Sequence, residues 1–438
     1  MRRLLHPAEE ICQIMAQIYG NKLTTVSGGN LSIRDGEGNV WVSPSGGDKA
    51  CLKRGDVCRI LENGEVCGHA KPSLEFKIHK GVYDRRPDIR AVLHAHSPAL
   101  VAMSIMHELP DVKILPDLYA LIGKAALAPY ALPGSEALVE NVGSVFAKGY
   151  DTVILENHGV FLGSKIDLFD AYKKFEALEL AACSQLMAKS IGKAAGSLTD
   201  EQLEKYGKLS ERKYGKLEEN KMTNEELLLR QEICRFTKRA YDKRIFGVSQ
   251  GVYSAKLSTG GMIITPLDAD NSALDEKELV RVEGDRCEAG KMPSIMAGLH
   301  GLIYKYCGDI RSIITAASPY AGIFVTTGEP YDVRVIPECF NRLQACRTFD
   351  FDTFLDCPEA IGEYLTLNTP VAIVANGFYI VCSVSPFAAY DRMEIFEYTA
   401  RSVHYTKIMQ KDIVKITDEN IEALKHRFKI PKPEMPAL

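Results

Sequence analysis

The sequence lacks several features that mark particular classes of protein. Its 438 residues contain no apolar run long enough to cross a bilayer, so we expect no membrane-spanning segment. The formal net charge is only −4, which gives no electrostatic reason to expect nucleic acid or an anionic membrane as a partner. The N-terminus has no continuous apolar core and no small-residue cleavage site, so it does not read as a signal peptide.

Paired cysteines are also missing. The twelve cysteines are scattered, without a C-x-x-C pair or a short disulfide framework. This pattern predicts reduced, mostly buried thiols in a cytoplasmic protein. With 46% hydrophobic and 25% charged residues the composition is that of a soluble globular protein, and the length predicts two or three domains.

The strongest positive feature is an internal duplication. Residues 7–32 align with residues 230–254, and the offset stays close to 221 residues, as between Ser97 and Ser318. Further matches are Pro72-Ser73 with Pro293-Ser294, Pro116 with Pro337, and Phe175-Glu176 with Phe396-Glu397. A constant offset over most of the chain indicates a tandem duplication.

The charged segment between the two copies is poor in apolar residues and predicts a solvated helical or flexible linker. Thr223 follows it and is typical of a helix N-cap that opens the second copy. The predicted division is a first domain carrying the candidate chemistry over 1–197, the linker over 198–222, and a degenerate second domain over 223–438.

Each half alternates strand-like and helical patterns. The strand-like pieces include NLSIRD, VWVSPS, AVLHAH and TVILEN, and helical patterns such as LEFKIHKGVYDRR separate them. This alternation favours a mixed α/β sandwich.

Three histidines of the first half are candidate metal ligands. His94 and His96 form an H-x-H pair on a short apolar strand, so both imidazoles point to one face. His158, in another β-rich run that ends in a turn, is the third candidate. Three histidines with an open fourth position are typical of catalytic zinc, a Lewis acid that can polarise a carbonyl. Glu75 can move a proton beside such a metal or occupy its open position.

The second half keeps the scaffold positions and replaces the polar ones. The aligned pairs are Asn30 with Val252, Ser45-Gly46 with Leu267-Asp268, Glu75 with Met296, His94 with Thr315, His96 with Ala317, Tyr119 with Phe340, and His158 with Asn376. Structural residues would have no reason to be lost together. Their joint replacement predicts one site, present in the first half only.

Two glycine-rich turns and one helix start can bind an anion. The turns are SGGN, with Gly29 and Asn30, and SPSGG, with Ser45 and Gly46, and their exposed N–H groups can form a nest. Ser73 follows Pro72 and opens the next helix, where free amides also favour an anion. Together they suggest a phosphorylated or carboxylated substrate.

These motifs resemble the class II aldolase/adducin family, which includes L-fuculose-phosphate aldolase, L-rhamnulose-phosphate aldolase and L-ribulose-phosphate 4-epimerase. The matching stretches cover most of residues 7–190 in the family's order: SGGNLSIRD, VSPSG, PSLEFKIHKGVYDRRPDIRAVLHAHSPALVAMS, LPDLYALIGKAALAPYALPGS and ENHGVFLGS. The resemblance implies tandem α/β/α sandwich domains, each with a central, mainly antiparallel sheet.

The resemblance also implies a reaction, which is the zinc-dependent cleavage of a ketose 1-phosphate or related sugar acid to dihydroxyacetone phosphate and an aldehyde. By this likeness His94, His96 and His158 hold zinc or another divalent metal, and Glu75 is the acid/base. Tyr119 would reach a neighbouring protomer's site, as expected for a homodimer or higher homo-oligomer. The residues that match the family's phosphate site are Gly29, Asn30, Ser45, Gly46 and Ser73.

Two departures leave alternatives open. Leu74 stands where such aldolases usually carry a second phosphate-binding serine, and the segment after Tyr119 has no acidic residue like the epimerase's catalytic aspartate. Decarboxylation or dehydration of a sugar acid is therefore an alternative to aldol cleavage, and the epimerase is disfavoured. A non-catalytic adducin-like scaffold is the third alternative, which the intact histidines and Glu75 oppose.

Overall fold

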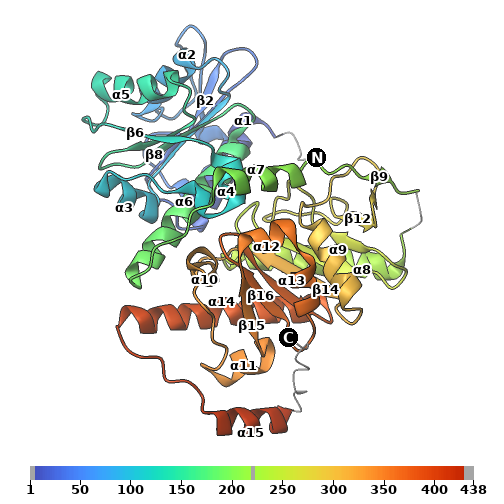
Figure 1. The fold of residues 1–438 in the computed structure, drawn as a ribbon. Coiled ribbons are helices and arrows are strands. Elements are labelled where there is room, and N and C mark those ends of the chain that lie inside the picture. The colour runs from blue at the N-terminus through green and yellow to red at the C-terminus, as the bar shows by residue number, and fades with distance from the viewer. Residues whose placement is uncertain (1–4, 219–221, 429–438) are drawn as a thin grey trace. The chain divides into compact units, whose positions relative to one another are not determined.

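The computed structural model describes residues 5–218 and 222–428, which form two compact units (Figure 1). One unit covers the chain up to Val112 together with Leu118–Cys183, and the other covers Lys113–Asp117 and the chain from Ser184 onward. The domain boundaries predicted at residues 197 and 223 remain predictions. Within 198–222 the chain forms helix α7 (Asp200–Leu209), which buries Leu203 and Tyr206.

The first unit is built on an eight-stranded sheet with the order β4-β3-β2-β1-β5-β8-β7-β6. All neighbouring strands are antiparallel except β6 and β7. The strands are β1 (Asn30–Arg34), β2 (Val40–Val42), β3 (Cys58–Ile60), β4 (Val66–Cys67), β5 (Ala91–Ala95), β6 (Ala125–Ala128), β7 (Thr152–Leu155) and β8 (Val160–Ser164). Strand β5 is central and buried at every position, as its unbroken apolar run requires.

Helices cover both faces of this sheet. Figure 1 shows α2 and α5 on one side, and α3 and α6 on the other. The helices of the first half are α1 (Pro7–Gly20), α2 (Phe76–Arg85), α3 (Pro98–Met106), α4 (Pro116–Ile122), α5 (Glu136–Ala147) and α6 (Leu168–Ser190), with 3-10 turns at Lys49–Cys51, Arg54–Asp56 and Val112–Ile114. Ile78 and Val82 of α2 pack with Phe146 of α5 and Phe161 of β8 in one core. The sheet is therefore the middle layer of a sandwich.

The second unit repeats this plan. Its sheet order, β15-β16-β17-β14-β10-β11-β12-β13-β9, is the first order read in reverse with one added edge strand, β9. The pairs β15–β16 and β13–β9 are parallel and the others antiparallel. The strands are β9 (Gly215–Lys216), β10 (Val252–Lys256), β11 (Met262–Ile264), β12 (Val280–Glu283), β13 (Arg286–Cys287), β14 (Ser312–Ala316), β15 (Cys346–Phe349), β16 (Val371–Val374) and β17 (Phe378–Ser383).

Strand β17 shows how the second sheet is buried on both sides. Phe378 and Ile380 join the core that includes Ile303 of α9, while Tyr379 meets Phe396 of α14 on the opposite face. Thr223 caps α8 through its side chain, as predicted. The helices are α8 (Asn224–Asp242), α9 (Ala297–Tyr306), α10 (Ala321–Thr327), α11 (Pro337–Leu343), α12 (Phe351–Asp356), α13 (Glu359–Tyr364), α14 (Pro386–Ile408) and α15 (Asp418–Phe428).

The two units also share strand register. Asn30 pairs with His94 across β1 and β5, and Val252 pairs with Thr315 across β10 and β14. Isolated bridges join Pro44 to Pro72 in one unit and Pro266 to Pro293 in the other. The predicted duplication and the mixed α/β fold with mainly antiparallel sheets are confirmed.

Two expectations from composition can be compared with the structure. Across residues 5–218 and 222–428, no helix combines the length and apolar character needed to cross a membrane. All twelve cysteines are free thiols, as expected. The expectation that most are buried is wrong: only Cys58, Cys287, Cys339 and Cys382 are buried. The others lie on helices, in turns or on the edge strands β4 and β15, where they are partly or fully exposed.

Candidate metal centre and active site

Three histidines converge at one end of strand β5. His94 is the penultimate residue of β5, His96 follows the strand, and His158 lies in the turn before β8, the neighbour of β5. One ring nitrogen from each of the three lies within 4.8 Å of the other two. The antiparallel pairing of Ala95 with Val160 brings His158 beside the H-x-H pair. The predicted set therefore meets in space.

His94 presents a lone pair, not a proton, to the common centre of the three histidines. His94 Nδ1–H donates to the carbonyl of Val160 at 2.9 Å, which leaves Nε2 unprotonated. Burial lowers the pKa of His94 well below its usual range, and burial also lowers the pKa of His96. Within the described residues the Nε2 atoms of His94 and His96 are buried without hydrogen-bond partners.

Glu75 completes the cluster from helix α2, where it occupies the N-cap position. Its Oε2 lies 3.3 Å from His94 Nε2 and its Oε1 lies 3.5 Å from His158 Nε2. A carboxylate oxygen and an imidazole lone pair repel each other unless a cation lies near both. Three imidazoles with a carboxylate beside them fit a divalent metal with an open coordination position.

Two glycines are required by the histidines. A Cβ at Gly159 would lie 2.6 Å from His96 Cδ2, closer than any side chain can approach. Gly29 has a φ of +74°, and a Cβ there would lie 2.8 Å from the His94 carbonyl oxygen. The predicted substrate-site residue Gly29 therefore has a steric reason to be glycine.

The predicted anion-binding segments are fastened to one another by backbone hydrogen bonds. The Ser45 N–H donates to Lys71 O at 2.8 Å, and the Ser73 N–H donates to Ser43 O at 3.3 Å. Gly46 and its neighbour Gly47 both have positive φ, so their loop can direct successive N–H groups outward.

The prediction that Ser73 opens the helix is wrong. Helix α2 begins at Phe76, and the Ser73 hydroxyl instead accepts a hydrogen bond from the Glu75 N–H at 3.3 Å. Pro72 bridges to Pro44 and holds this stretch extended, which delays the start of the helix. Ser73 is thereby tied to the backbone of Glu75.

Lys49 was not among the predicted site residues. Its side chain is 1% exposed beneath the SPSGG loop, and its Nζ donates to Pro44 O at 2.7 Å. Burial lowers its pKa. Its counterpart is the neutral Asn271, since the N–H groups of Lys49 and Asn271 donate to Val26 O and Val248 O at 2.9 and 2.8 Å. The replacement of this lysine by an asparagine in the second half is the sequence signal that could have identified Lys49 as a site residue.

Asn30 lies against Glu75 and not in an isolated turn. Its Nδ2 donates to Glu75 Oε2 at 2.6 Å, and its Oδ1 lies 2.5 Å from His79 Nε2. The sequence comparison missed His79 because the second half also has a histidine there, His300.

Tyr119 and Leu74 are exposed, unlike the three histidines, Glu75 and Asn30. Tyr119 on α4 is 38% exposed and Leu74 is 80% exposed. Phe340, the counterpart of Tyr119 on α11, is 5% exposed. The surface around α4 thus differs between the copies.

The second unit has no equivalent centre in its described parts, where no group of three metal-binding side chains occurs. The alignment of His158 with Asn376 is wrong. Asn376 corresponds to Asn157, because both have positive φ, 55° and 54°, and their N–H groups donate to Val325 O and Ser104 O. The turn has the same length in both units, because the pairs Ile154–Val160 and Ile373–Tyr379 are equivalent, and Gly377 takes the place of His158.

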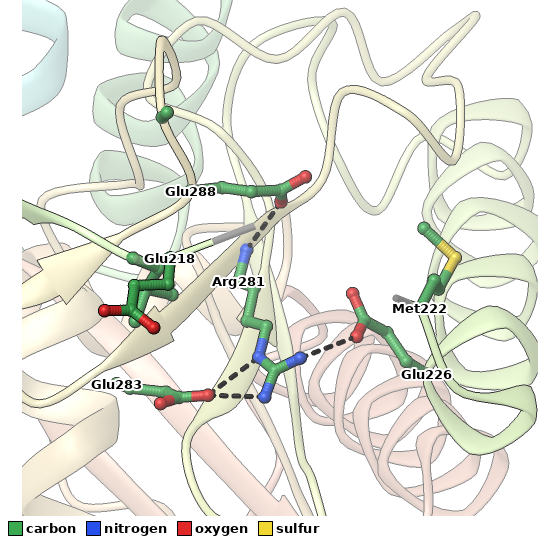
Figure 2. Close-up of a pocket in the computed structure, with 8 residues that line it drawn as sticks. Glu218, Met222, Glu226, Arg281, Glu283 and Glu288 are labelled. Atoms are coloured by element: carbon green, nitrogen blue, oxygen red, sulfur yellow. Dashed lines mark hydrogen bonds and ion pairs between the residues drawn. The ribbon is translucent and has the colours of Figure 1, made fainter. Parts of the chain in front are cut away.

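The second unit does contain a cavity of about 340 Å³ in another location (Figure 2). Arg281 crosses it and donates to Glu283 and, at 3.2 Å, to Glu226, while its backbone N–H donates to Glu288. Glu226 and Glu288 also bind the buried Arg230. These paired charges hold α8 to β12.

Known proteins similar to this chain are lyases. It is 34% identical over 170 residues to an L-fuculose phosphate aldolase of Methanococcus maripaludis, a match that covers 39% of this chain and 89% of the relative. It is 32% identical over 207 residues to a 3-oxo-tetronate 4-phosphate decarboxylase of Haemophilus influenzae, covering 46% of this chain and 97% of the relative. A solved L-fuculose 1-phosphate aldolase matches with 31% identity and a TM-score of 0.41, covering 45% of this chain and 92% of that one.

The family model for the Class II Aldolase and Adducin N-terminal domain matches the chain twice, at residues 9–186 and 231–424. These two ranges contain the paired sheets described above and most of the sequence. The chain therefore belongs to the class II aldolase and adducin family, as a tandem duplication.

Proposed function

We propose that this protein is a metal-dependent lyase that cleaves a ketose 1-phosphate to dihydroxyacetone phosphate and an aldehyde. One observation carries the proposal: three imidazoles and the Glu75 carboxylate converge in the first unit, and among the described residues the buried Nε2 atoms of His94 and His96 have no hydrogen-bond partner. A scaffold protein has no need for such a costly cluster. Membership of the family and the named aldolase relative support the same reaction.

His94, His96 and His158 would hold the metal, and three histidine ligands favour zinc. When bound, the metal supplies a Lewis acid that polarises the carbonyl of the substrate. Tight packing of Gly159 on His96, and the hydrogen bond from His94 Nδ1 to Val160, keep two of the three rings from turning away.

Glu75 would move the proton at the carbon next to the carbonyl. In cleavage, the hydroxyl that becomes the aldehyde loses its proton, the carbon–carbon bond breaks, and its electron pair passes to the carbonyl side. The carbon left there then takes up one proton, so the reaction neither gains nor loses protons overall. Glu75 is suited to this transfer because its carboxylate is only 15% exposed and lies within 3.5 Å of two of the proposed ligands.

The anionic group of the substrate would bind above the SPSGG loop, near Ser45, Gly46 and Ser73. The positive φ angles of the loop allow outward N–H groups, and the buried Lys49 ammonium beneath Pro44 adds positive charge. Neither feature needs the second phosphate-binding serine that Leu74 replaces.

Tyr119 would act in the site of a neighbouring protomer, exchanging the proton of the aldehyde oxygen. Its exposed position on α4 supports contact with a second copy of the chain. We therefore also propose a homo-oligomer whose active sites contain residues of two protomers.

Decarboxylation of a 3-oxo sugar acid phosphate is the second candidate. The similarity to a 3-oxo-tetronate 4-phosphate decarboxylase over 97% of that relative favours it. Here the bond to the carboxylate breaks, carbon dioxide leaves, and Glu75 returns one proton to the same kind of carbon.

The deciding experiment measures two products side by side. One assay follows the release of dihydroxyacetone phosphate from a panel of ketose 1-phosphates, and a second follows the release of carbon dioxide from 3-oxo-tetronate 4-phosphates. Both are run with and without chelator. We expect chelator-sensitive dihydroxyacetone phosphate and one metal ion per chain. Carbon dioxide alone would select the decarboxylase, and neither product with no bound metal would favour the scaffold.

A further inference from the structure

A buried chain of hydrogen bonds runs from the proposed acid/base into the core. Asn30 Nδ2 donates to Glu75 Oε2 at 2.6 Å, and Asn30 Oδ1 lies 2.5 Å from His79 Nε2. On the other side of the ring, His79 Nδ1 lies 2.7 Å from Ser32 Oγ, which lies 2.8 Å from Tyr83 Oη. His79 is fully buried and Asn30 is 4% exposed, so water cannot replace these partners freely.

The direction of each bond follows from the carboxylate. A carboxylate only accepts, so Asn30 must turn its NH₂ group to Glu75 and its oxygen to His79. His79 Nε2 must then carry a proton and donate it, which leaves Nδ1 to accept from the Ser32 hydroxyl. Burial lowers the pKa of His79 to about 4, so the ring is neutral near pH 7 and has one donor and one acceptor, as this chain requires.

The second unit keeps only the inner half of the chain. His300 Nδ1 lies 2.8 Å from Ser254 Oγ, which lies 2.8 Å from Tyr304 Oη. Val252 and Met296 stand in the places of Asn30 and Glu75, and His300 Nε2 is buried without a hydrogen-bond partner among the described residues. The contacts from histidine Nδ1 to serine and from serine to tyrosine therefore serve the fold in both units. The Nε2 atom makes a hydrogen bond only in the unit that has the carboxylate.

We propose that His79 is a positioning residue that sets the orientation of the Asn30 amide and thereby holds the Glu75 carboxylate at the metal centre. The proposal rests on the proposed role of Glu75. An asparagine amide has two nearly isosteric orientations, and the wrong one would aim its oxygen at Glu75 Oε2. Glu75 and the Nε2–H of His79 favour the same orientation from opposite sides of the amide, because the reverse orientation would set two acceptors against each other at Glu75 and two donors against each other at His79.

The test compares three variants of the full-length protein. His79→Leu removes the donor and keeps apolar bulk, and His79→Gln restores an N–H that can donate to Asn30. His300→Leu is the matched control. His300 Nδ1 contacts a serine that in turn contacts a tyrosine, as His79 Nδ1 does, but its Nε2 has no acceptor among the described residues. Each is measured for metal content, melting temperature, kcat, KM and deuterium exchange at the hydroxymethyl carbon of dihydroxyacetone phosphate.

We expect His79→Leu to keep its metal and its KM, and to lose roughly 10- to 100-fold in both kcat and deuterium exchange. His79→Gln should recover most of this loss. His300→Leu should lower the melting temperature as much as His79→Leu does and leave kcat unchanged. A purely structural role would instead lower the amount of folded enzyme equally in both leucine variants, without a selective loss of kcat.

A readout independent of turnover separates this proposal from the proposed function. The side-chain NH₂ of Asn30, labelled with ¹⁵N and assigned by its loss in Asn30→Asp, should be protected from solvent exchange in the wild type and lose protection in His79→Leu. Unchanged protection in His79→Leu, or an unchanged kcat in an active enzyme, would overturn the positioning role. If the wild type cleaves no substrate, the lyase assignment is overturned. If the Asn30 NH₂ group nevertheless loses its protection in His79→Leu, the positioning of Asn30 by His79 remains supported.

Discussion

The two units share one fold but differ in the polar residues they hold at one end of the central strand. In the first, His94 lies near the end of β5 and His96 directly follows the strand, with Glu75 beside His94. In the second, β14 has Thr315 at the equivalent position and α9 begins beside the buried Met296. The comparison teaches that the sheet and its helices form without the site residues, so these residues are retained for another reason.

A buried glutamate present in both copies shows what a structural carboxylate looks like. Glu179 accepts from Ser97 Oγ and from the N–H groups of Ala99 and Leu100, at the start of α3. Glu397 does the same at the start of α10, accepting from Ser318, Tyr320 and Ala321. Each holds three donors of its own fold. Glu75, in contrast, faces imidazole lone pairs and is lost from the copy that lacks them.

The largest test of this difference removes a proposed ligand. His94→Ala should lose bound metal and at least roughly 10³-fold in turnover, the equivalent of about 4 kcal/mol of transition-state stabilisation. Thr315→Ala, at the equivalent strand position, should change neither quantity. Elemental analysis and product release check both variants, and a His94→Ala protein with full metal content would break the comparison.

Glu75→Gln should keep the metal and the fold while losing roughly 10²- to 10⁴-fold in proton exchange and turnover, because the amide cannot carry the proton. Met296→Gln is the control in the second unit and should have wild-type kinetics. Deuterium exchange into dihydroxyacetone phosphate measures the step directly. Normal exchange in Glu75→Gln would remove this residue from the mechanism.

Tyr119→Phe copies the second unit's Phe340 into the first and should slow turnover by about 10²-fold with the metal retained. If Tyr119 acts in a neighbour's site, mixing Tyr119→Phe with Glu75→Gln and reassembling the oligomer should restore part of the activity, since some sites would then have both wild-type residues. Activity that stays at the level of the separate variants would place Tyr119 in its own protomer's site.

Acid should destabilise both units through equivalent buried histidines, His79 in the first unit and His300 in the second. Burial lowers the pKa of His79 to about 4 and that of His300 to about 3, from 6.5. The unfolded chain therefore takes up protons below about pH 6.5 that the folded chain refuses, so each histidine should cost about 2 to 3 kcal/mol of unfolding free energy by about pH 4.5. Urea unfolding at about pH 6.5 and at about pH 4.5 measures this loss of unfolding free energy. The His300→Leu variant should lose less of it than the wild type does.

The smallest expected effect concerns Lys49. Lys49→Asn gives the first unit the residue of the second and should raise KM for a phosphorylated substrate roughly tenfold, about 1.4 kcal/mol, because one buried positive charge is lost. The KM for an uncharged analogue should not change. Equal effects on both substrates would assign Lys49 to loop structure alone.

Much of this protein could be read from its sequence because the evidence was local or repeated. An H-x-H pair on an apolar strand needs only the two-residue period of a strand to bring two imidazoles to one face. The constant offset between the halves identified the duplication, the shared fold and the set of polar residues replaced together. The convergence of the three histidines and the proximity of Glu75 followed from that information, and family membership followed from the resemblance of the motifs.

Other features were decided only by tertiary structure. The start of α2 at Phe76 and the burial of Lys49 depend on loop conformation, which short-range patterns do not determine. The link from His79 through Asn30 to Glu75 joins side chains 49 and 45 residues apart, and His79 looked like scaffold because the second unit has the same residue. Which nitrogen of a buried histidine finds an acceptor is settled by the packing of α2 against β1, and no single-residue comparison contains that information.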